Sequence, residues 1–132
     1  MNDVNTDNNY NQVFSQRTKS LTIAIINELS EIPNSDKISN IRKQIFRSVS
    51  STASNYRAMC RARSLKEKYS KICIVVEEAD ETLFWLELID ELKLLQTEKT
   101  NGLLKEADEI VKATSAYKKK LSEDLKRINN QL

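Results

Sequence analysis

The sequence has very few of the residues that make tight turns. Gly102 is its single glycine and Pro33 is its single proline. Sandwiches and barrels of β-strands need many hairpin turns, and nucleotide-binding folds need glycine-rich loops, so both classes are excluded. With 39% hydrophobic and 30% charged residues over 132 positions, the chain is instead expected to form one domain of a few long amphipathic helices.

Histidine is absent, and cysteine occurs only twice. The chain therefore has no His-based catalytic triad, no imidazole base and no zinc site that uses histidine. A di-iron centre of the kind found in helical bundles needs Glu-x-x-His motifs and is excluded for the same reason. Cys60 and Cys73 are expected to be reduced, buried thiols, with a disulfide between them as the alternative. We expect no cofactor, no metal and no enzymatic activity.

The chain carries no sign of a membrane or secretion signal. Residues 1–10 are rich in Asn and Asp and lack the basic start and apolar stretch of a signal peptide. The longest apolar runs, residues 72–76 and 83–86, are far shorter than the roughly 20 residues that span a bilayer. A soluble, cytoplasmic protein that does not bind a membrane is the expectation.

The spacing of apolar residues predicts four helices, over about 14–32, 35–63, 65–95 and 99–129. Pro33 ends the first helix, and the second can be capped by Asn34, Ser35 or Asp36. Ser64 has the spacing to Glu67 that is typical of a capping box. Residues 1–13 are polar and show no periodicity, so they are expected to form a flexible arm outside a bundle of residues 14–132. Four helices with short connections predict an all-α, antiparallel, up-down-up-down four-helix bundle.

The third predicted helix has more apolar surface than one bundle seam requires. Its main apolar row is formed by Leu65, Tyr69, Ile72, Val76, Ala79, Leu83 and Leu86. Residues 83–86 are consecutive apolar positions that cover nearly a full turn, and Leu88 and Ile89 follow them. One interpretation is a central helix that its neighbours cover completely. The other is a self-association interface, formed by Phe84, Trp85 and Leu88.

The formal net charge of +2 conceals a strong segregation of charge along the chain. Residues 36–71 contain 10 basic and 2 acidic side chains, whereas residues 72–98 contain 1 basic and 8 acidic side chains. The second predicted helix and the start of the third are therefore strongly basic, and the rest of the third helix is strongly acidic.

Four of these basic residues share one face of the second predicted helix. At 100° per residue they lie opposite the isoleucine row and form a stripe roughly 27 Å long, enough to meet several phosphates of a nucleic acid. The residues of this basic stripe are Lys43, Arg47, Arg57 and Arg61. Ser50 and Ser54 lie on the same face and have hydroxyl groups that can donate to phosphate oxygens.

The basic stripe also has a purely structural interpretation. It is then a solvated face, or it is neutralised by the acidic face of the third predicted helix, where Glu77, Glu78, Asp80 and Glu81 cluster. A second basic run, over residues 118–127, is interrupted by Glu123 and Asp124 and adds little to the nucleic-acid interpretation.

Two segments of the sequence carry a family resemblance. The first is Arg47-Ser-Val-Ser-Ser-Thr-Ala-Ser-Asn55, and the second runs from Ser64 to Leu88. They resemble the four-helix bundle family of ribosomal RNA intervening-sequence proteins, and the similarity covers about residues 14–125. The residues that match the family motifs are Arg47, Ser51, Ser54, Asn55 and Glu81. Ala53 stands where the family has proline, and Ala58 and Met59 stand where it has Glu-Gly, so a kink or special turn at these positions is not implied.

The resemblance implies a bacterial protein with an antiparallel four-helix bundle that assembles into a ring-shaped homopentamer. Such a ring would also account for the surplus apolar surface of the third helix. A related branch, the accessory variability determinants of diversity-generating retroelements, binds a reverse transcriptase and nucleic acid through a basic surface. The family has no established catalytic activity, so the resemblance implies no reaction.

The preferred functional interpretation is a non-enzymatic oligomeric bundle whose basic stripe contacts RNA or DNA phosphates without reading sequence. In an oligomer, the stripe would be displayed several times and would gain avidity. The alternative is a protein-protein interaction scaffold, in which the basic and acidic helices pair during oligomer assembly and the remaining surface docks a partner protein.

Overall fold

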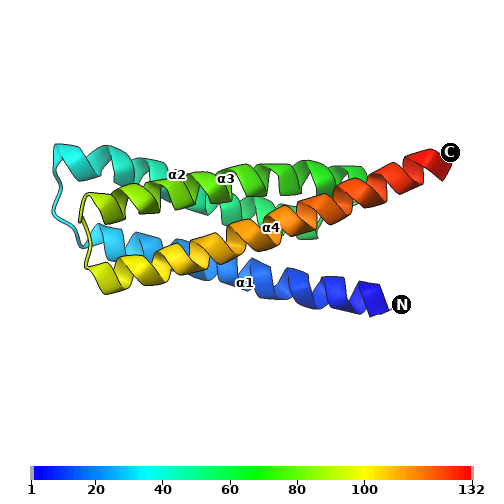
Figure 1. Cartoon of the computed structure of the whole chain (residues 1–132), viewed down its shortest axis with the longest axis horizontal. Helices are drawn as coiled ribbons and strands as arrows, with labels where there is room; N and C mark the ends of the chain where they lie inside the picture. The colour runs from blue at the N-terminus through cyan, green and yellow to red at the C-terminus, as the bar shows by residue number, and fades with distance from the viewer. Residues whose placement is uncertain (1, 132) are drawn as a thin grey trace.

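The protein consists of four α-helices, as a computed structural model of residues 2–131 shows; side chains are described from Asn8 onward (Figure 1). The helices are α1 (Asn2–Ser30), α2 (Asp36–Cys60), α3 (Leu65–Glu91) and α4 (Thr97–Gln131). The described residues contain no β-strand, which confirms the predicted all-α class. None of these helices combines the length and the apolar character that a membrane-spanning helix needs.

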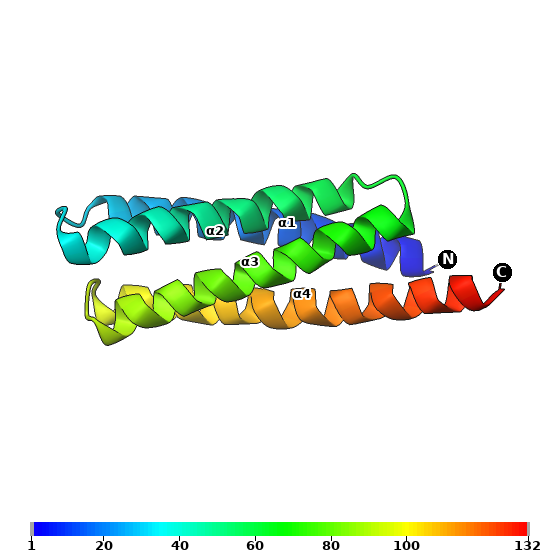
Figure 2. The same cartoon turned by 90° about the horizontal axis from the view of Figure 1, so that it is seen from above.

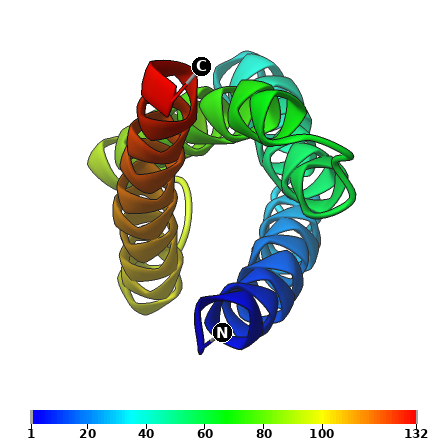
Figure 3. The same ribbon diagram turned by 90° about the vertical axis from the view of Figure 1, so that its right-hand side faces the viewer.

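The connections between the helices alternate between the two ends of the molecule. The α1–α2 and α3–α4 connections lie at one end, and the α2–α3 connection lies at the other end with both termini (Figures 1 and 2). Each helix packs against the next one in the chain, and α1 also contacts α4. Viewed along the bundle, α1 and α4 diverge toward the ends that carry the termini (Figure 3).

The core is formed by the rows of apolar residues that the sequence predicts. In α2 the whole predicted row is buried, from Ile38 to Met59. In α3 the buried face is rotated from the prediction, because Val75, Thr82 and Ile89 are buried while Val76 and Leu83 are only half-buried. The reason is that α3 lies between α2 and α4 and packs against both, so its buried surface is wider than one seam.

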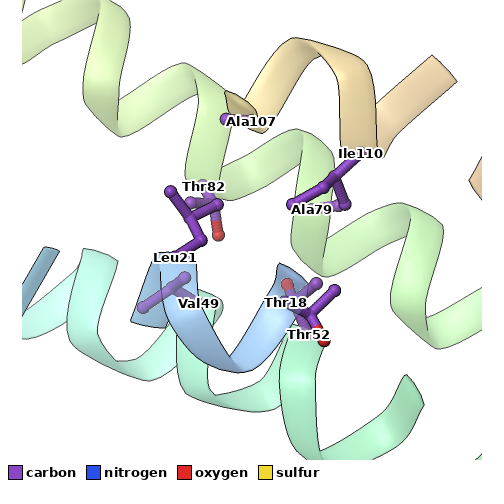
Figure 4. Close-up of a pocket in the computed structure, with 8 residues that line it drawn as sticks. All are labelled: Thr18, Leu21, Val49, Thr52, Ala79, Thr82, Ala107 and Ile110. Carbon is purple, nitrogen blue, oxygen red and sulfur yellow. The ribbon is translucent and has the colours of Figure 1, made fainter. Parts of the chain in front are cut away.

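Small residues and threonines bring the four helices close together at the centre of the bundle. The side chains there leave no room for a water-sized sphere, so this region is packed interior and no ligand cavity. The residues, drawn in Figure 4, are Thr18, Leu21, Val49, Thr52, Ala79, Thr82, Ala107 and Ile110. The hydroxyls of Thr82 and Ser48 are 2.9 Å apart and form a buried hydrogen bond between α3 and α2.

Polar side chains cap the helix ends. Ser35 caps α2 by accepting from the Ile38 N–H at 3.3 Å, and Ser64 caps α3 by accepting from the Glu67 N–H at 3.1 Å, as predicted. The guanidinium of Arg42 donates to the Leu29 and Ile32 carbonyls at the end of α1, at 2.9 and 2.8 Å. Arg42 therefore stabilises a helix C-terminus and is not a free surface cation.

The N-terminal segment differs from the prediction. The sequence predicts a flexible arm over residues 1–13 and a first helix from 14, but α1 begins at Asn2. Tyr10 anchors the additional turns, since its hydroxyl donates to the Ala113 carbonyl at 2.8 Å and its ring stacks on Tyr117 with centroids 5.3 Å apart. One aromatic side chain among polar residues has no periodicity, so a pattern of apolar spacing does not detect it.

The seam between α1 and α4 is held by charged side chains. Arg17 donates to Glu106 through Nε at 3.0 Å and to Glu109 through Nη2 at 2.6 Å. Lys99 reaches Glu28 at 3.1 Å further along the same seam. The hydrogen bond from Arg17 and the attraction of its charge hold the pKa of Glu106 below its usual value and raise the pKa of Arg17.

Replacing Gly102 with Ala should stabilise the protein. Gly102 is an exposed residue inside α4, and an added Cβ would meet no atom within 4 Å. Since Gly in a helix interior costs about 0.5–1 kcal/mol relative to Ala, the free energy of unfolding should rise by about that amount. Urea denaturation followed by circular dichroism measures it, with Lys105→Ala as a nearly neutral control. A loss of stability in Gly102→Ala would contradict the open surroundings of this position.

Replacing Glu106 with Gln should lower stability in a pH-dependent way. The pKa of Glu106 is lower in the folded chain than in the unfolded chain, so the charged form contributes stability at neutral pH and this contribution is lost as the pH falls through the lowered pKa. Arg17 and Glu106 are both partly exposed, so at neutral pH the free energy of unfolding of the wild type should exceed that of Glu106→Gln by only about 0.5–1 kcal/mol. Urea denaturation at a series of pH values and fixed protein concentration measures the gap. A gap that stays constant down to about pH 3, where a carboxyl is protonated, would refute a stabilising role for the charged form.

Candidate nucleic-acid interface

Part of the basic stripe lies along an open groove between α1 and α2. The groove has a volume of about 690 Å³ and is almost entirely polar in its side chains. Its lining residues are Gln12, Ser15, Gln16, Lys19 and Thr22 from α1, and Ser50, Ala53, Ser54 and Arg57 from α2. We refer to it as the α1–α2 groove.

The α1–α2 groove carries positive charge that its surroundings do not neutralise. Arg57 and Lys19 are exposed, and neither forms an ion pair with any side chain of residues 8–131. Ser54 donates only a long hydrogen bond, 3.3 Å, to the Ser51 carbonyl. Two cations beside hydroxyl groups that can rotate toward a ligand form a surface suited to phosphate oxygens.

Arg47 belongs to a different part of the surface. It donates through Nη1 to Glu78 at 2.9 Å and through Nη2 to Glu81, so it joins α2 to α3. Partial burial alone would lower the pKa of Arg47, but the hydrogen bonds and charges of Glu78 and Glu81 raise it overall. For this residue of the stripe the structure agrees with the structural interpretation, neutralisation by the acidic face of α3.

The other two stripe residues lie toward opposite ends of α2. Lys43 is exposed in the first half of the helix, and Arg61 is the C-cap residue directly after α2, with its backbone N–H bound to the Arg57 and Ala58 carbonyls. Neither side chain forms an ion pair with the side chains that the structure describes. Of the four predicted stripe residues, only Arg57 lines the groove.

The groove residues from α1 were not predicted from the sequence. Gln12, Gln16 and Lys19 recur at a spacing of four and three, which is the signal of a shared helix face. The prediction placed Gln12 in the arm of residues 1–13, and within the first predicted helix it followed the apolar residues, so it did not consider the polar face with Gln16 and Lys19. Lys19 contributes the second cation of the groove, so the sequence prediction identified only one of its two positive charges.

The residues predicted to form an oligomer interface lie on the outer side of α3. Phe84 is 51% exposed, and its ring meets that of Trp85 edge-on with centroids 5.0 Å apart. Trp85 and Leu88 are half-buried, and the indole N–H of Trp85 donates to Glu81 at 3.3 Å. These neighbours cover α3 only in part, so an exposed aromatic ring remains next to an acidic patch.

The two cysteines are free thiols, which rules out the alternative of a disulfide between them. Both are half-buried, and burial raises the pKa of Cys60. Within the described part of the chain, no three His, Cys, Asp or Glu side chains are grouped so that they could hold a metal ion.

Replacing Arg47 with Met should destabilise the fold more than replacing Arg57 with Met. The first change removes an inter-helix network and leaves Glu78, whose side chain is only 19% exposed, without its partner. We expect the free energy of unfolding to fall by about 0.5–1 kcal/mol in Arg47→Met and to change by no more than about 0.5 kcal/mol in Arg57→Met. Urea denaturation measures both. Equal losses in the two variants would argue against a special structural role for Arg47.

Two comparisons with known proteins relate this fold to a family. The sequence profile of the 23S rRNA-intervening sequence protein family matches residues 11–116. The fold is similar to a crystal structure of a protein of unknown function from the S23 ribosomal protein family, from Bacteroides thetaiotaomicron VPI-5482. The TM-score is 0.74 and the sequence identity is 28%, over 83% of this chain and 97% of that chain. A comparison with curated proteins gave no match. The chain thus belongs to the family of 23S rRNA-intervening sequence proteins.

Proposed function

We propose that this protein binds nucleic acid, RNA or DNA, through the phosphate backbone. The single observation that carries the proposal is the α1–α2 groove, where Arg57 and Lys19 are exposed and unneutralised beside serine hydroxyls. Arg61 and Lys43 extend the cationic surface along α2 beyond the groove. Arg47 is not part of the contact, because Glu78 and Glu81 already bind its guanidinium.

The binding we propose is electrostatic and independent of base sequence. Each phosphate that a Lys or Arg neutralises releases condensed counterions, so the affinity falls with salt by a slope of about 0.9 per phosphate on a duplex. A groove lined by Lys, Ser and Gln side chains is suited to phosphate oxygens and positions a nucleic acid without specifying it.

We propose further that the protein is non-enzymatic and cytoplasmic, and that each chain is an antiparallel up-down-up-down bundle in a ring-shaped homopentamer. The exposed ring of Phe84, with Trp85 and Leu88 beside it, supports a contact between subunits. A ring would present several copies of the groove to one nucleic acid, and weak contacts would then act together.

A second candidate function is a protein-protein interaction scaffold. The ion pairs of Arg47 with Glu78 and Glu81 favour it, because they show that one basic residue of α2 pairs with the acidic face of α3. Under this alternative, the remaining cations of the stripe would pair with acidic residues of a neighbouring subunit, and a partner protein would occupy the remaining surface.

Charge reversal at Arg57 in the groove and at Arg61 beyond it should distinguish the two candidates. The variant Arg57→Glu/Arg61→Glu should raise the Kd for a labelled duplex about tenfold or more and lower the salt slope by about 0.9 for each phosphate that is no longer neutralised. Fluorescence anisotropy over a salt series measures both quantities. Lys37→Glu/Lys105→Glu is the matched control, because both lysines are exposed and lie away from the groove.

The mass of the assembly gives the second readout. Under nucleic-acid binding, light scattering should find the same oligomer for the wild type and the variant. Under the scaffold alternative, the variant should form a smaller oligomer. If the wild-type protein binds neither RNA nor DNA at low salt, the proposed function is wrong.

A further inference from the structure

A second basic groove lies between α3 and α4, apart from the α1–α2 groove. Its volume is about 300 Å³, and it is lined by Tyr69 of α3 and by Ser115, Lys118, Lys119, Ser122, Glu123 and Lys126 of α4. We refer to it as the α3–α4 groove. The basic run of α4 had little weight in the sequence because Glu123 and Asp124 interrupt it, but in the structure three of its lysines line one groove.

The charge in this groove is positive and largely unneutralised. Lys118, Lys119 and Lys126 form no ion pair with any side chain that the structure describes. Glu123 is the one carboxylate among the lining residues and opposes them only in part. A surface of this kind attracts a polyanion and is suited to phosphate oxygens.

Tyr69 distinguishes this groove from the α1–α2 groove. On sequence grounds Tyr69 belongs to an apolar row, yet in the structure it is only half-buried and lines the groove beside the lysines. The lining of the α1–α2 groove contains no aromatic side chain. Proteins that bind single-stranded nucleic acid combine an aromatic ring with nearby cations, since a base stacks on the ring while the phosphates meet the cations.

The two grooves lie on different flanks of the bundle: the α3–α4 groove is near one end, and the α1–α2 groove extends from the centre toward that same end. That end holds the α2–α3 connection and both termini, and Figure 3 shows α1 and α4 on opposite sides of it. Arg61, Arg63 and Lys66 lie at or next to the connection and continue the positive charge between the flanks. A duplex is stiff over about 150 base pairs and can follow only one flank, whereas a flexible single strand can pass around the connection to both.

We propose that the α3–α4 groove binds a single-stranded segment of nucleic acid, with Tyr69 stacking on a base and Lys118, Lys119 and Lys126 contacting the adjacent phosphates. This inference rests on the proposed nucleic-acid binding and extends it. It assigns the single strand to the α3–α4 groove and the duplex to the α1–α2 groove.

The experiment compares two labelled probes, a uridine oligomer of about 16 nucleotides and a DNA duplex, by fluorescence anisotropy over a salt series. The charge variant is Lys118→Gln/Lys119→Gln/Lys126→Gln. It should weaken binding of the uridine oligomer about tenfold or more and lower its salt slope by about 0.7 for each phosphate that is no longer neutralised, with less than a twofold change for the duplex. The matched control, Lys37→Gln/Lys93→Gln/Lys105→Gln, removes three exposed lysines toward the end of the bundle that carries the α1–α2 and α3–α4 connections. The Kd of this control for the uridine oligomer should stay within twofold of the wild-type value.

A second pair of variants tests the stacking role. Tyr69→Leu should weaken binding of the uridine oligomer about tenfold, because one stacked base is worth about 1–3 kcal/mol, and should leave the salt slope unchanged. Tyr69→Phe keeps the ring and should bind as the wild type does. Because Tyr69 also packs against the core, thermal unfolding by circular dichroism must show that each variant folds before binding is compared.

The outcomes separate this inference from the proposed function. In one outcome, the wild type binds the duplex, Arg57→Glu/Arg61→Glu abolishes that binding, and the lysine and Tyr69 variants bind the uridine oligomer as the wild type does. The α3–α4 groove is then not the single-strand site, and only this inference fails. If the lysine variant changes the mass of the protein assembly but not the affinity for the uridine oligomer, the α3–α4 groove binds a second copy of the chain. That result also overturns the inference. Failure of the wild type to bind either probe overturns both proposals.

Discussion

The contact between α2 and α3 is the interaction on which the rest of the structure depends. Its apolar part is the buried row of α2 against the wide face of α3, and its polar part is the hydrogen bond between Ser48 and Thr82. The Thr82 hydroxyl can also donate to the Glu78 carbonyl of its own helix, and that of Ser48 to the Ile45 carbonyl, but the bond between the two hydroxyls forms only when α2 and α3 stand in this register. That register also aligns Arg47 with Glu78 and Glu81.

The same register divides the cations of α2 into two groups with different roles. Toward α3, Arg47 meets carboxylates and is neutralised. Toward α1, Arg42 caps a helix end, and Arg57 lines a groove with Lys19 and uncharged side chains. A basic stripe identified from helix periodicity is therefore not one functional unit. What each cation can bind depends on which neighbouring helix lies beside it.

Most of the fold could be predicted from the sequence, because each long helix has a repeating apolar row and recognisable ends. Ser35 and Ser64 cap α2 and α3, as their positions before the apolar rows indicate. The start of α1 could not be predicted, because it depends on one residue, Tyr10, and on partners more than 100 positions away in α4. For the same reason, the α3–α4 groove is invisible in the sequence. Tyr69 and Lys119 become neighbours only when the helices pack.

A surface made only of helices also limits what the protein can recognise. Backbone N–H groups inside a helix bind carbonyls of the same helix, so side chains alone are left to meet a ligand in either groove. In both grooves these side chains are mostly Lys, Ser and Gln, and Arg57 is the one arginine. Such side chains make specific contacts only where they reach base edges, whereas in an open groove they meet phosphate oxygens first. Under the proposed function, selectivity would therefore come from the shape of the nucleic acid, from whether a strand can bend around the α2–α3 connection and reach both flanks.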